Sequence, residues 1–358
     1  MEEYTARLPI LVVGLPGVPG YNAFFYLRRL FPGQVIGIVP PNAPQLFEKV
    51  PPLYFSPSLI SADPEKIDQL TQVFDQFQVR TVVDASGWCA LKPCELDPAL
   101  GRRLNIDVGV NVMREAKRAG ARLIRLSTDL VFDGTPYLRN GILVEGDYVE
   151  DWPVSPVTNY GRFIAESEVQ ILTEYSEAAI LRIALPMGPS MNGHAGAIDW
   201  IESRFSKNRP ATLYFDEVRS NLYVQDLNKV ILAFINNNEK GLYHVGGPVP
   251  LSLFEIAQAI NKLGNYPQEL LMGCLRAAAG PMPPRAGNVV MNTDRVTRLL
   301  PKGILRPWPA SPSHLPTDRD WHTKRESQFP NQAIAHYLYG DDMDSWDHPL
   351  NLMGFGST

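Results

Sequence analysis

Short apolar runs alternate with amphipathic segments along the first half of this 358-residue chain. Apolar runs that are rich in branched residues and bounded by glycine or proline are typical of buried parallel strands. Segments with apolar residues three or four positions apart are typical of helices. We therefore predict strands at residues 9–13, 35–39, 81–85, 123–127 and 179–183, and helices at 21–31, 63–77 with Pro64 at its start, 98–119 and 159–173.

The regular order of strands and helices predicts the fold class. Strand–helix–strand units connect through right-handed crossovers, so the strands become parallel and helices cover both faces of the sheet. The sequence therefore predicts an α/β protein with a Rossmann-like, doubly wound parallel sheet. In such a sheet the ligand lies beyond the carboxyl ends of the strands.

The alternation ends near Pro186, where proline, glycine and aromatic residues become irregularly spaced. A capping box, Ser252-x-x-Glu255, predicts a further helix that runs to Leu263, and residues 242–245 are typical of a strand that returns to the sheet. We predict a Rossmann-like domain at residues 1–185 to which 222–246 return, a smaller mixed lobe at 186–310, and a C-terminal extension at 311–358 that is a surface wrap or a partly disordered tail.

Charge and composition exclude several classes of partner and location. The net charge is −5 and the basic residues are scattered, which argues against nucleic acid and anionic membranes as partners. The three cysteines have neither the even count of a disulfide framework nor the spacing of a zinc site, so a reducing compartment is the simplest interpretation. No run approaches the roughly 20 apolar residues that span a bilayer, and the start Met1-Glu2-Glu3-Tyr4 is acidic where a signal peptide is basic. We expect a cytoplasmic protein.

Three glycines, Gly14, Gly17 and Gly20, follow the first predicted strand and precede the first predicted helix. In this setting a glycine-rich turn lets backbone approach a pyrophosphate, and the helix N-terminus offers unpaired N–H groups to the anion. Pro16 and Pro19 each remove an N–H from the turn. A plain structural turn is the alternative.

The choice of dinucleotide depends on the end of the second strand. An acidic residue there binds the ribose hydroxyls of NAD, but this chain has Val39-Pro40-Pro41-Asn42. Arg28 and Arg29 on the preceding helix lead us to prefer NADP slightly over NAD as the cofactor.

Several motifs resemble one family of the extended short-chain dehydrogenases/reductases. The stretch L-S-T-D-L-V-F-D-G at residues 126–134 is similar to the S-T-D-x-V-F-D-G segment of dTDP-4-dehydrorhamnose reductases and of the related regulatory β subunit of methionine adenosyltransferase. Residues 156–161, P-V-T-N-Y-G, resemble the segment that carries the catalytic tyrosine, and G-L-Y-H at 241–244 resembles a later family segment. The resemblance covers about residues 9–300.

The resemblance implies an oxidoreductase that transfers hydride between a nicotinamide and the carbonyl of a nucleotide-linked sugar, as in dTDP-rhamnose biosynthesis. It implies that Thr128 orients the carbonyl and that Tyr160 exchanges the proton. It also places Ala85, Ser86 and Asn105 with Tyr160 and the three glycines among the cofactor-binding residues, and it implies no metal. The alternatives are that Thr128 simply caps a turn and that Tyr160 anchors a helix start.

The chain departs from the family pattern at several positions. The family has a lysine four residues after the tyrosine, where it lowers the tyrosine's pKa, and this chain has Ile164. Arg162 is close in sequence, but two residues along a helix it faces elsewhere. Asp84 replaces an asparagine, Lys92 replaces an aspartate, and the segment between Thr128 and Tyr160 is several residues longer.

Two functions therefore stay open. The first is an NAD(P)-dependent reductase of a nucleotide-linked 4-keto sugar, with catalysis impaired by Ile164. The second is a non-catalytic NADP-binding regulator or scaffold like the methionine adenosyltransferase β subunit, acting on a protein partner. A homodimer is compatible with both.

Other residues that could carry chemistry have simpler interpretations. Asp129 and Asp133 look like a metal pair, but no histidine is near them and a turn suits Asp133-Gly134 better. We expect His244 to be a core histidine, and Cys89 and Cys94 to be small buried residues rather than nucleophiles.

Overall fold

The computed structural model describes residues 6–41, 58–191, 195–309, 315–317 and 338–339. Its centre is a seven-stranded sheet in the order β13-β8-β5-β4-β1-β2-β3. Every pairing is parallel. The strands are β1 (Ile10–Val13), β2 (Val35–Val39), β3 (Leu59–Ser61), β4 (Thr81–Asp84), β5 (Arg122–Thr128), β8 (Ala179–Ile183) and β13 (Gly241–Val245). The predicted Rossmann-like parallel sheet is confirmed.

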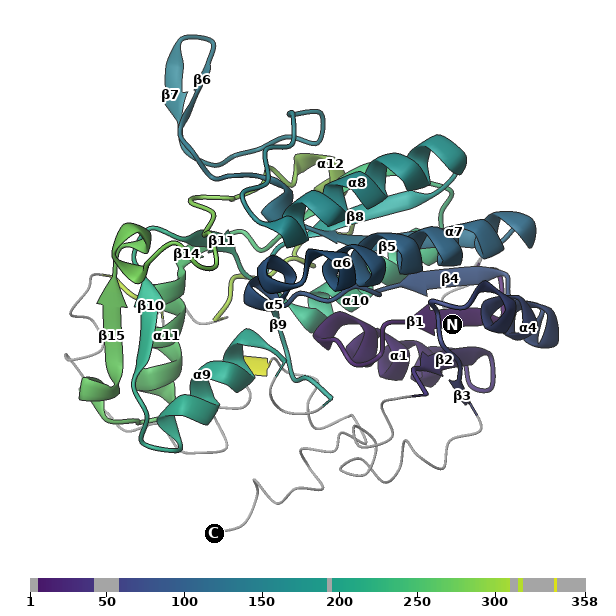
Figure 1. Ribbon diagram of the computed structural model, residues 1–358, viewed down its shortest axis with the longest axis horizontal. Helices are drawn as coiled ribbons and strands as arrows, with labels where there is room; N and C mark the ends of the chain where they lie inside the picture. The colour runs from purple at the N-terminus through teal and green to yellow at the C-terminus, as the bar shows by residue number, and fades with distance from the viewer. Residues whose placement is uncertain (1–5, 42–57, 192–194, 310–314, 318–337, 340–358) are drawn as a thin grey trace.

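Helices cover both faces of this sheet (Figure 1). α1 (Val18–Leu30) and α10 (Val224–Ile235) pack together on one face. α4 (Ile67–Phe77), α7 (Val108–Arg118) and α8 (Asn159–Glu174) pack on the other. The two apolar layers between helices and sheet form the main core of the molecule.

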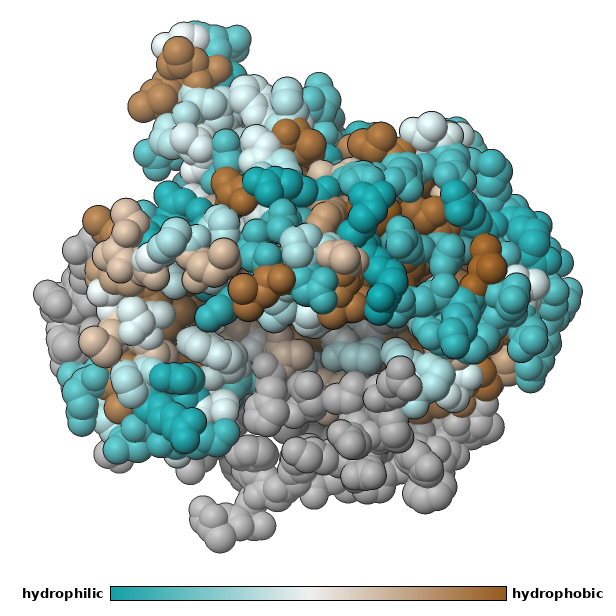
Figure 2. Space-filling model, viewed as in Figure 1, coloured by the Kyte–Doolittle hydropathy of each residue, from teal (hydrophilic) through white to brown (hydrophobic). Residues whose placement is uncertain are grey.

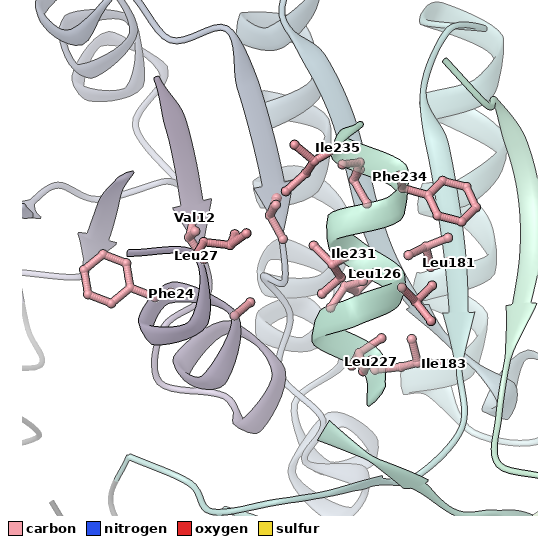
Figure 3. Close-up of a cluster of buried hydrophobic side chains, with 14 of the residues drawn as sticks. Val12, Phe24, Leu27, Leu126, Leu181, Ile183, Leu227, Ile231, Phe234 and Ile235 are labelled. Carbon is pink, nitrogen blue, oxygen red and sulfur yellow. The ribbon is translucent and has the colours of Figure 1, made fainter. Parts of the chain in front are cut away.

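The core beneath α1 and α10 shows why these strands are apolar throughout. In Figure 3, Leu227, Ile231 and Phe234 of α10 lie against Leu126 and Leu181 of the sheet. Each of these side chains is buried. Burying one such side chain stabilises a fold by roughly 1.5–3 kcal/mol relative to leaving it exposed.

Three short elements on the second face form one continuous helical segment. α6 (Pro98–Arg102) leads through the π turn η1 (Arg103–Asp107) into α7. We predicted one helix over residues 98–119, and the structure interrupts it with the π turn. An additional short helix, α5 (Leu91–Leu96), precedes it.

A second cluster of apolar residues forms the core of the C-terminal part. It lies among α9 (Ala197–Phe205), β10 (Ala211–Tyr214), α11 (Leu253–Leu263) and β15 (Leu271–Cys274). The Ser252 hydroxyl accepts from the Glu255 N–H while the Glu255 carboxylate accepts from the Ser252 N–H, so the predicted capping box is present. Trp308 and Leu338 belong to the same core, and the Trp308 indole donates to the Leu338 carbonyl.

Small elements connect these two parts. They are η2 (Asp129–Val131), β9 (Pro186–Met187), β11 (Val218–Ser220), β12 (Leu222–Tyr223), β14 (Pro250–Ser252), η3 (Gln268–Leu270), η4 (Arg276–Ala279) and α12 (Asp294–Thr297). The longer segment between Thr128 and Tyr160 contains an antiparallel hairpin of β6 (Tyr137–Arg139) and β7 (Ile142–Val144). This hairpin projects from the molecule and carries the exposed side chains of Leu138, Ile142 and Leu143 (Figures 1 and 2).

Two predicted helix starts are wrong. The helix expected from Tyr21 begins at Val18, directly after the glycine turn. The helix expected behind Pro64 begins at Ile67, because residues 63–66 form a turn in which the Lys66 N–H donates to the Asp63 carbonyl. Most of the predicted C-terminal extension lies outside the described residues. Across the described part of the chain, no helix has the length and apolar character needed to cross a membrane.

Candidate functional site

The predicted site residues gather at the carboxyl ends of β1, β4 and β5. β1 pairs with β4 on one side and with β2 on the other. The chain leaves β1 in one direction toward β2 and β3, and in the other toward β4, β5, β8 and β13. Such a topological switch point is where open α/β sheets bind ligands.

The glycine turn is closely packed against the end of β4. Gly14 has φ +86°, and a Cβ at this position would lie 2.2 Å from the Ala85 carbonyl oxygen. A Cβ at Gly20 would lie 2.2 Å from the Gly14 carbonyl oxygen. Both positions therefore require glycine. Gly17 is the N-cap of α1, and its N–H donates to the Gly14 carbonyl at 3.1 Å. The turn thus leads directly into the helix N-terminus, as predicted.

The arginines that favoured NADP lie far from this turn. Arg28 and Arg29 are in the last turn of α1, about 15 Å along the helix from its first turn. The Arg28 guanidinium stacks over the Phe24 ring at 5.3 Å. They therefore give no reason to prefer NADP over NAD. Asn42, at the end of the strand that discriminates the two cofactors, lies outside the described residues.

The loop after β4 forms the second wall of the site. The Ala85 N–H donates to the Val13 carbonyl at 3.0 Å, and the Ser86 N–H donates to Oδ1 of Asp84 at 2.9 Å. Asn105 is fully buried behind this loop. Its Oδ1 accepts from the Trp88 N–H at 2.7 Å, and its Nδ2 donates to the Gly101 carbonyl at 2.8 Å. Asn105 therefore fixes the position of the loop through these hydrogen bonds.

Tyr160 and Thr128 are in contact at the end of β5. Tyr160 lies in the first turn of α8, which Thr158 caps by accepting from the Gly161 N–H at 3.0 Å. A Cβ at Gly161 would lie 2.2 Å from the Leu130 carbonyl oxygen, so glycine lets the helix start approach the end of β5 closely. The side chains of Thr128 and Cys89 lie close enough to the Tyr160 hydroxyl to affect its ionisation.

Thr128 also has the structural role considered as its alternative. Its hydroxyl caps η2 by accepting from the Leu130 N–H at 3.2 Å, and it donates to Oδ1 of Asp129 at 3.2 Å. The hydroxyl is thereby fixed in orientation while it remains beside Tyr160. Capping and a site location are compatible here.

Asp129 is paired with an arginine from the C-terminal part of the chain. Asp129 is fully buried, and Arg219 of β11 contacts both of its carboxylate oxygens, with Nε 2.6 Å from Oδ2. The Asp133 carboxylate accepts from the Thr135 N–H at 2.9 Å, which is the expected turn role. No cluster of three or more potential metal ligands occurs among the described residues.

The expectation for the cysteines is right for Cys94 and wrong for Cys89. Cys94 is buried, whereas Cys89 is exposed. Burial of the surroundings raises the pKa of the Cys89 thiol, and the positive charge of Arg219 partly opposes this rise. Cys89 is therefore a protonated thiol at neutral pH, next to the Tyr160 hydroxyl.

The position four residues after Tyr160 supplies no charge. Ile164 is buried, and its Cδ1 would lie 3.8 Å from a Cβ at Gly87. Arg162 is exposed and donates to Oδ1 of Asn159 at 2.9 Å, so it faces away as predicted. Thr128 and Cys89, the side chains beside the Tyr160 hydroxyl, are not cations. Burial raises the pKa of Tyr160 well above its usual value, and Cys89 adds to this rise.

Comparison with known proteins identifies the family. Residues 26–313 match the family model described as the RmlD substrate binding domain. The chain belongs to this family.

Two curated relatives illustrate the range of the family. The chain is 29% identical over 212 residues to methionine adenosyltransferase 2 subunit beta of Xenopus tropicalis, covering 57% of this chain and 60% of the relative. It is 26% identical over 201 residues to dTDP-4-dehydrorhamnose reductase of Aggregatibacter actinomycetemcomitans, covering 54% and 64%. In each comparison the match spans less than two thirds of the relative.

A solved structure confirms the fold of this RmlD-family chain. The dTDP-4-dehydrorhamnose reductase of Bacillus anthracis, solved in complex with NADP, superposes with a TM-score of 0.63 at 20% identity. The superposition covers 81% of this chain and 92% of that one. At this identity the likeness establishes the Rossmann-like fold.

Sequence reasoning missed two residues of the site in this family member. Arg219 reaches Asp129 from 90 positions away, and no local motif reports such a distance. Cys89 follows the strand-end segment that the motif comparison had already located, so its proximity to the site could have been inferred from position alone.

Proposed function

We propose that this RmlD-family chain is an NAD(P)-dependent reductase of a nucleotide-linked 4-keto sugar. The observation that carries the proposal is the contact between the Tyr160 and Thr128 hydroxyls at the sheet edge where the glycine turn ends. Two hydroxyls side by side can both hydrogen-bond to one carbonyl oxygen. The reductase relatives support the proposal. A cytoplasmic location remains part of it.

The residues of the turn fit a dinucleotide. At Gly14 and Gly20 even a methyl group would collide with backbone, and the α1 N-terminus follows at once. Backbone N–H groups between Gly14 and Gly20 would hold the diphosphate. Ala85 and Ser86, beside the glycine turn, would contact the dinucleotide, and Asn105 would contribute by supporting their loop. When bound, the dinucleotide supplies the hydride.

The chain's own residues would perform the rest of the reaction. Thr128 donates its single hydroxyl hydrogen to Asp129 in the free site, and on substrate binding it would turn this hydrogen to the carbonyl oxygen and orient the carbonyl. Tyr160 would give its hydroxyl proton to that oxygen as the carbonyl carbon accepts the hydride, which leaves an alcohol and a tyrosinate. Water would then return a proton to Tyr160. Such a positioned proton donor accelerates reactions by roughly 10²–10⁴-fold.

A second function is favoured by one specific observation. Thr128 and Cys89 lie beside the Tyr160 hydroxyl and neither is cationic, and Ile164 occupies the position where the family pattern has lysine. This weakens proton transfer, and it agrees with a regulatory or scaffold protein like the methionine adenosyltransferase β subunit. Such a protein would keep the dinucleotide site and bind a protein partner.

A turnover assay separates the two functions. NADPH and NADH oxidation is followed with dTDP-4-keto sugars for the wild type and for Tyr160→Phe, with Arg162→Ala as a control whose side chain faces away. The reductase predicts turnover that falls by about 100-fold in Tyr160→Phe and is unchanged in Arg162→Ala. Dinucleotide binding without any turnover would reject the reductase and favour the regulator.

A further inference from the structure

A proton donor at Tyr160 needs a positive charge to stabilise the tyrosinate that it leaves behind. Burial opposes this anion, and so does the neighbouring Cys89. Thr128 and Cys89, the side chains beside the hydroxyl, carry no positive charge, and Ile164 supplies none. If the site works, its positive charge comes from another element of the fold.

A buried ion pair lies across β4 and β5 below the site. Asp84 and Arg125 are register partners on these two strands. Their side chains are 0% and 2% exposed, and Nη1 of Arg125 lies 2.8 Å from Oδ2 of Asp84. A buried ion pair is rarely more stabilising than apolar residues of similar size, because both charges lose their hydration. The interior of a parallel sheet is usually apolar, so stability alone does not account for this pair.

The ion pair is hydrogen-bonded to the loop after β4, which forms one wall of the site. Nη1 of Arg125 donates to Oγ of Ser86 at 2.6 Å, and Oδ1 of Asp84 accepts from the Ser86 N–H at 2.9 Å. Both polar groups of Ser86 are thereby fixed by the two charged residues. Ser86 follows Ala85, against which Gly14 packs. The ion pair thus sets the position of the loop relative to the glycine turn.

The guanidinium also keeps an unused donor. Nη2 of Arg125 has no hydrogen-bond partner among the described residues, and neither has Oγ of Ser167 on α8. Both lie against Gly109, where a Cβ would be 3.1 Å from Nη2 and 3.2 Å from Oγ. Ser167 is one turn along α8 from Ile164, on the face that carries Tyr160. The absence of a side chain at Gly109 leaves room for the guanidinium next to this helix.

The charge of Arg125 acts on Tyr160. It is a cation that lowers the pKa of the tyrosine, against the rise caused by burial and by Cys89. The other charged groups at this edge are paired as well: Asp129 with Arg219, and Glu217 with Arg285. Asp84 offsets part of the Arg125 charge from the opposite side.

We propose that Arg125 is a positioning residue that supplies the positive charge of the site from β5, and that it acts through Tyr160 and Ser86. From the neighbouring strand β5, Arg125 supplies the positive charge that Ile164 cannot provide. The ion pair with Asp84 fixes its position. The Asp84 and Ile164 departures are then parts of one rearrangement. This inference rests on the proposed reductase function.

The test measures the ionisation of Tyr160 without requiring activity. Tyr160 is replaced by 3,5-difluorotyrosine, whose fluorines bring the ionisation of the phenol into an accessible pH range, and is titrated by ¹⁹F NMR. In Arg125→Met the titration midpoint is expected to rise by about one pH unit or more, a tenfold weaker acid. In Arg125→Lys it stays near that of the wild type. In Arg125→Met with Ile164→Lys it returns toward the wild type.

Asp84→Asn tests the sign of the electrostatic effect on the titration midpoint of Tyr160. Removal of the counter-charge leaves Arg125 less neutralised, so the midpoint should fall, in the direction opposite to Arg125→Met. A merely structural disturbance of the loop would move both variants in the same direction. This variant also serves if Arg125→Met fails to fold.

Two results would overturn the inference. One is a midpoint in folded Arg125→Met equal to that of the wild type. The other is a shift in the same direction in Arg125→Met and Asp84→Asn. If the wild type turns over 4-keto sugars, the pH profile of kcat should shift in parallel with the ¹⁹F titration. If it does not turn over, the reductase is rejected by that assay while the titration still decides the role of Arg125.

Discussion

Three glycines at the site occupy positions where a side chain would collide with backbone. Gly14, Gly20 and Gly161 each allow two backbone segments to meet, and a Cβ on any of them would lie 2.2 Å from a carbonyl oxygen. Gly17 differs, because its Cβ would have 3.5 Å to the nearest atom and its φ is −78°. This contrast provides a matched pair of variants.

Gly14→Ala should destabilise the fold and abolish dinucleotide binding. The positive φ and the collision with Ala85 together predict a loss of about 2 kcal/mol or more in the free energy of unfolding. The free energy of unfolding of Gly17→Ala should lie within about 1 kcal/mol of the wild-type value. Urea unfolding and dinucleotide titration measure both effects. Equal stability of the two variants would show that the turn is packed differently.

Cys89 should behave as an accessible but weakly acidic thiol. Because burial raises its pKa, alkylation by iodoacetamide should be slow at pH 7 and accelerate as the pH rises past the range of an ordinary cysteine. Bound NADPH should slow the reaction, since the thiol lies beside Tyr160. Mass spectrometry of wild type and Cys89→Ser identifies the modified position, and buried Cys94 serves as the internal control. Fast alkylation at pH 7 would contradict the assigned environment.

At the scale of elements, strands were predicted more accurately than helices. β2 and β8 have the predicted bounds, because short apolar runs between breaker residues define buried parallel strands sharply. α10 was not predicted. It packs against both α1 and the sheet, and its polar residues Gln225, Asp226 and Asn228 are buried together with its apolar ones.

The contact between β8 and β13 contains a neutral histidine in the core. His244 is fully buried beside its register partner Arg182, and its Nδ1 lies 3.0 Å from the Tyr148 carbonyl. Burial, together with the charge of Arg182, lowers the pKa of His244 from 6.5 to about 3. This agrees with the expectation of a core histidine.

His244 should make the fold less stable in acid. Between pH 6.5 and about 3 the unfolded chain binds a proton at this histidine and the native chain does not. Stability contributed by the residue is therefore present above pH 6.5 and falls by up to about 1.4 kcal/mol for each pH unit below it. Glu202, whose pKa burial raises to about 7, contributes with the opposite sign between 4.5 and 7.

The comparison of wild type with His244→Gln isolates the histidine from Glu202. Urea unfolding at pH 7, 6, 5 and 4 should show a stability difference that changes steadily in favour of the variant as the pH falls. A difference that is independent of pH would mean that the histidine binds its proton equally well in the native and unfolded states.

At the scale of the whole molecule, one buried ion pair joins the sheet to the C-terminal part. Arg219 of β11 contacts Asp129 after β5, and both are almost fully buried. Removal of one partner leaves the other charge unpaired in the interior, which typically costs roughly 3–5 kcal/mol.

Arg219→Met should therefore lower the thermal midpoint strongly, whereas Arg102→Ala should leave it unchanged. Arg102 pairs with Glu166 at the surface, where both side chains are about half exposed, and such pairs contribute little. Differential scanning calorimetry measures both variants. Equal thermal midpoints for the two variants would show that the Asp129–Arg219 pair does not hold the two parts together.

The site was predictable where local sequence determines it. The glycine turn, Thr128 and Tyr160 lie in short motifs, so their meeting at the sheet edge followed from the fold class. Arg219 and Arg125 were not found, because each acts on a residue of another strand or helix. The loss of a positive charge at Ile164 gave no sign of where a replacement lies. Cys89 was predicted to be buried because cysteine is a small apolar residue type. Its exposure follows from the geometry of the loop.

The central claim is that a dinucleotide binds at the glycine turn between β1 and α1. Isothermal titration calorimetry with NADPH and NADH measures this directly on the full chain. The account predicts saturable binding of at least one of the two at a single site, lost in Gly14→Ala. Absence of binding of either dinucleotide at millimolar concentration would contradict it.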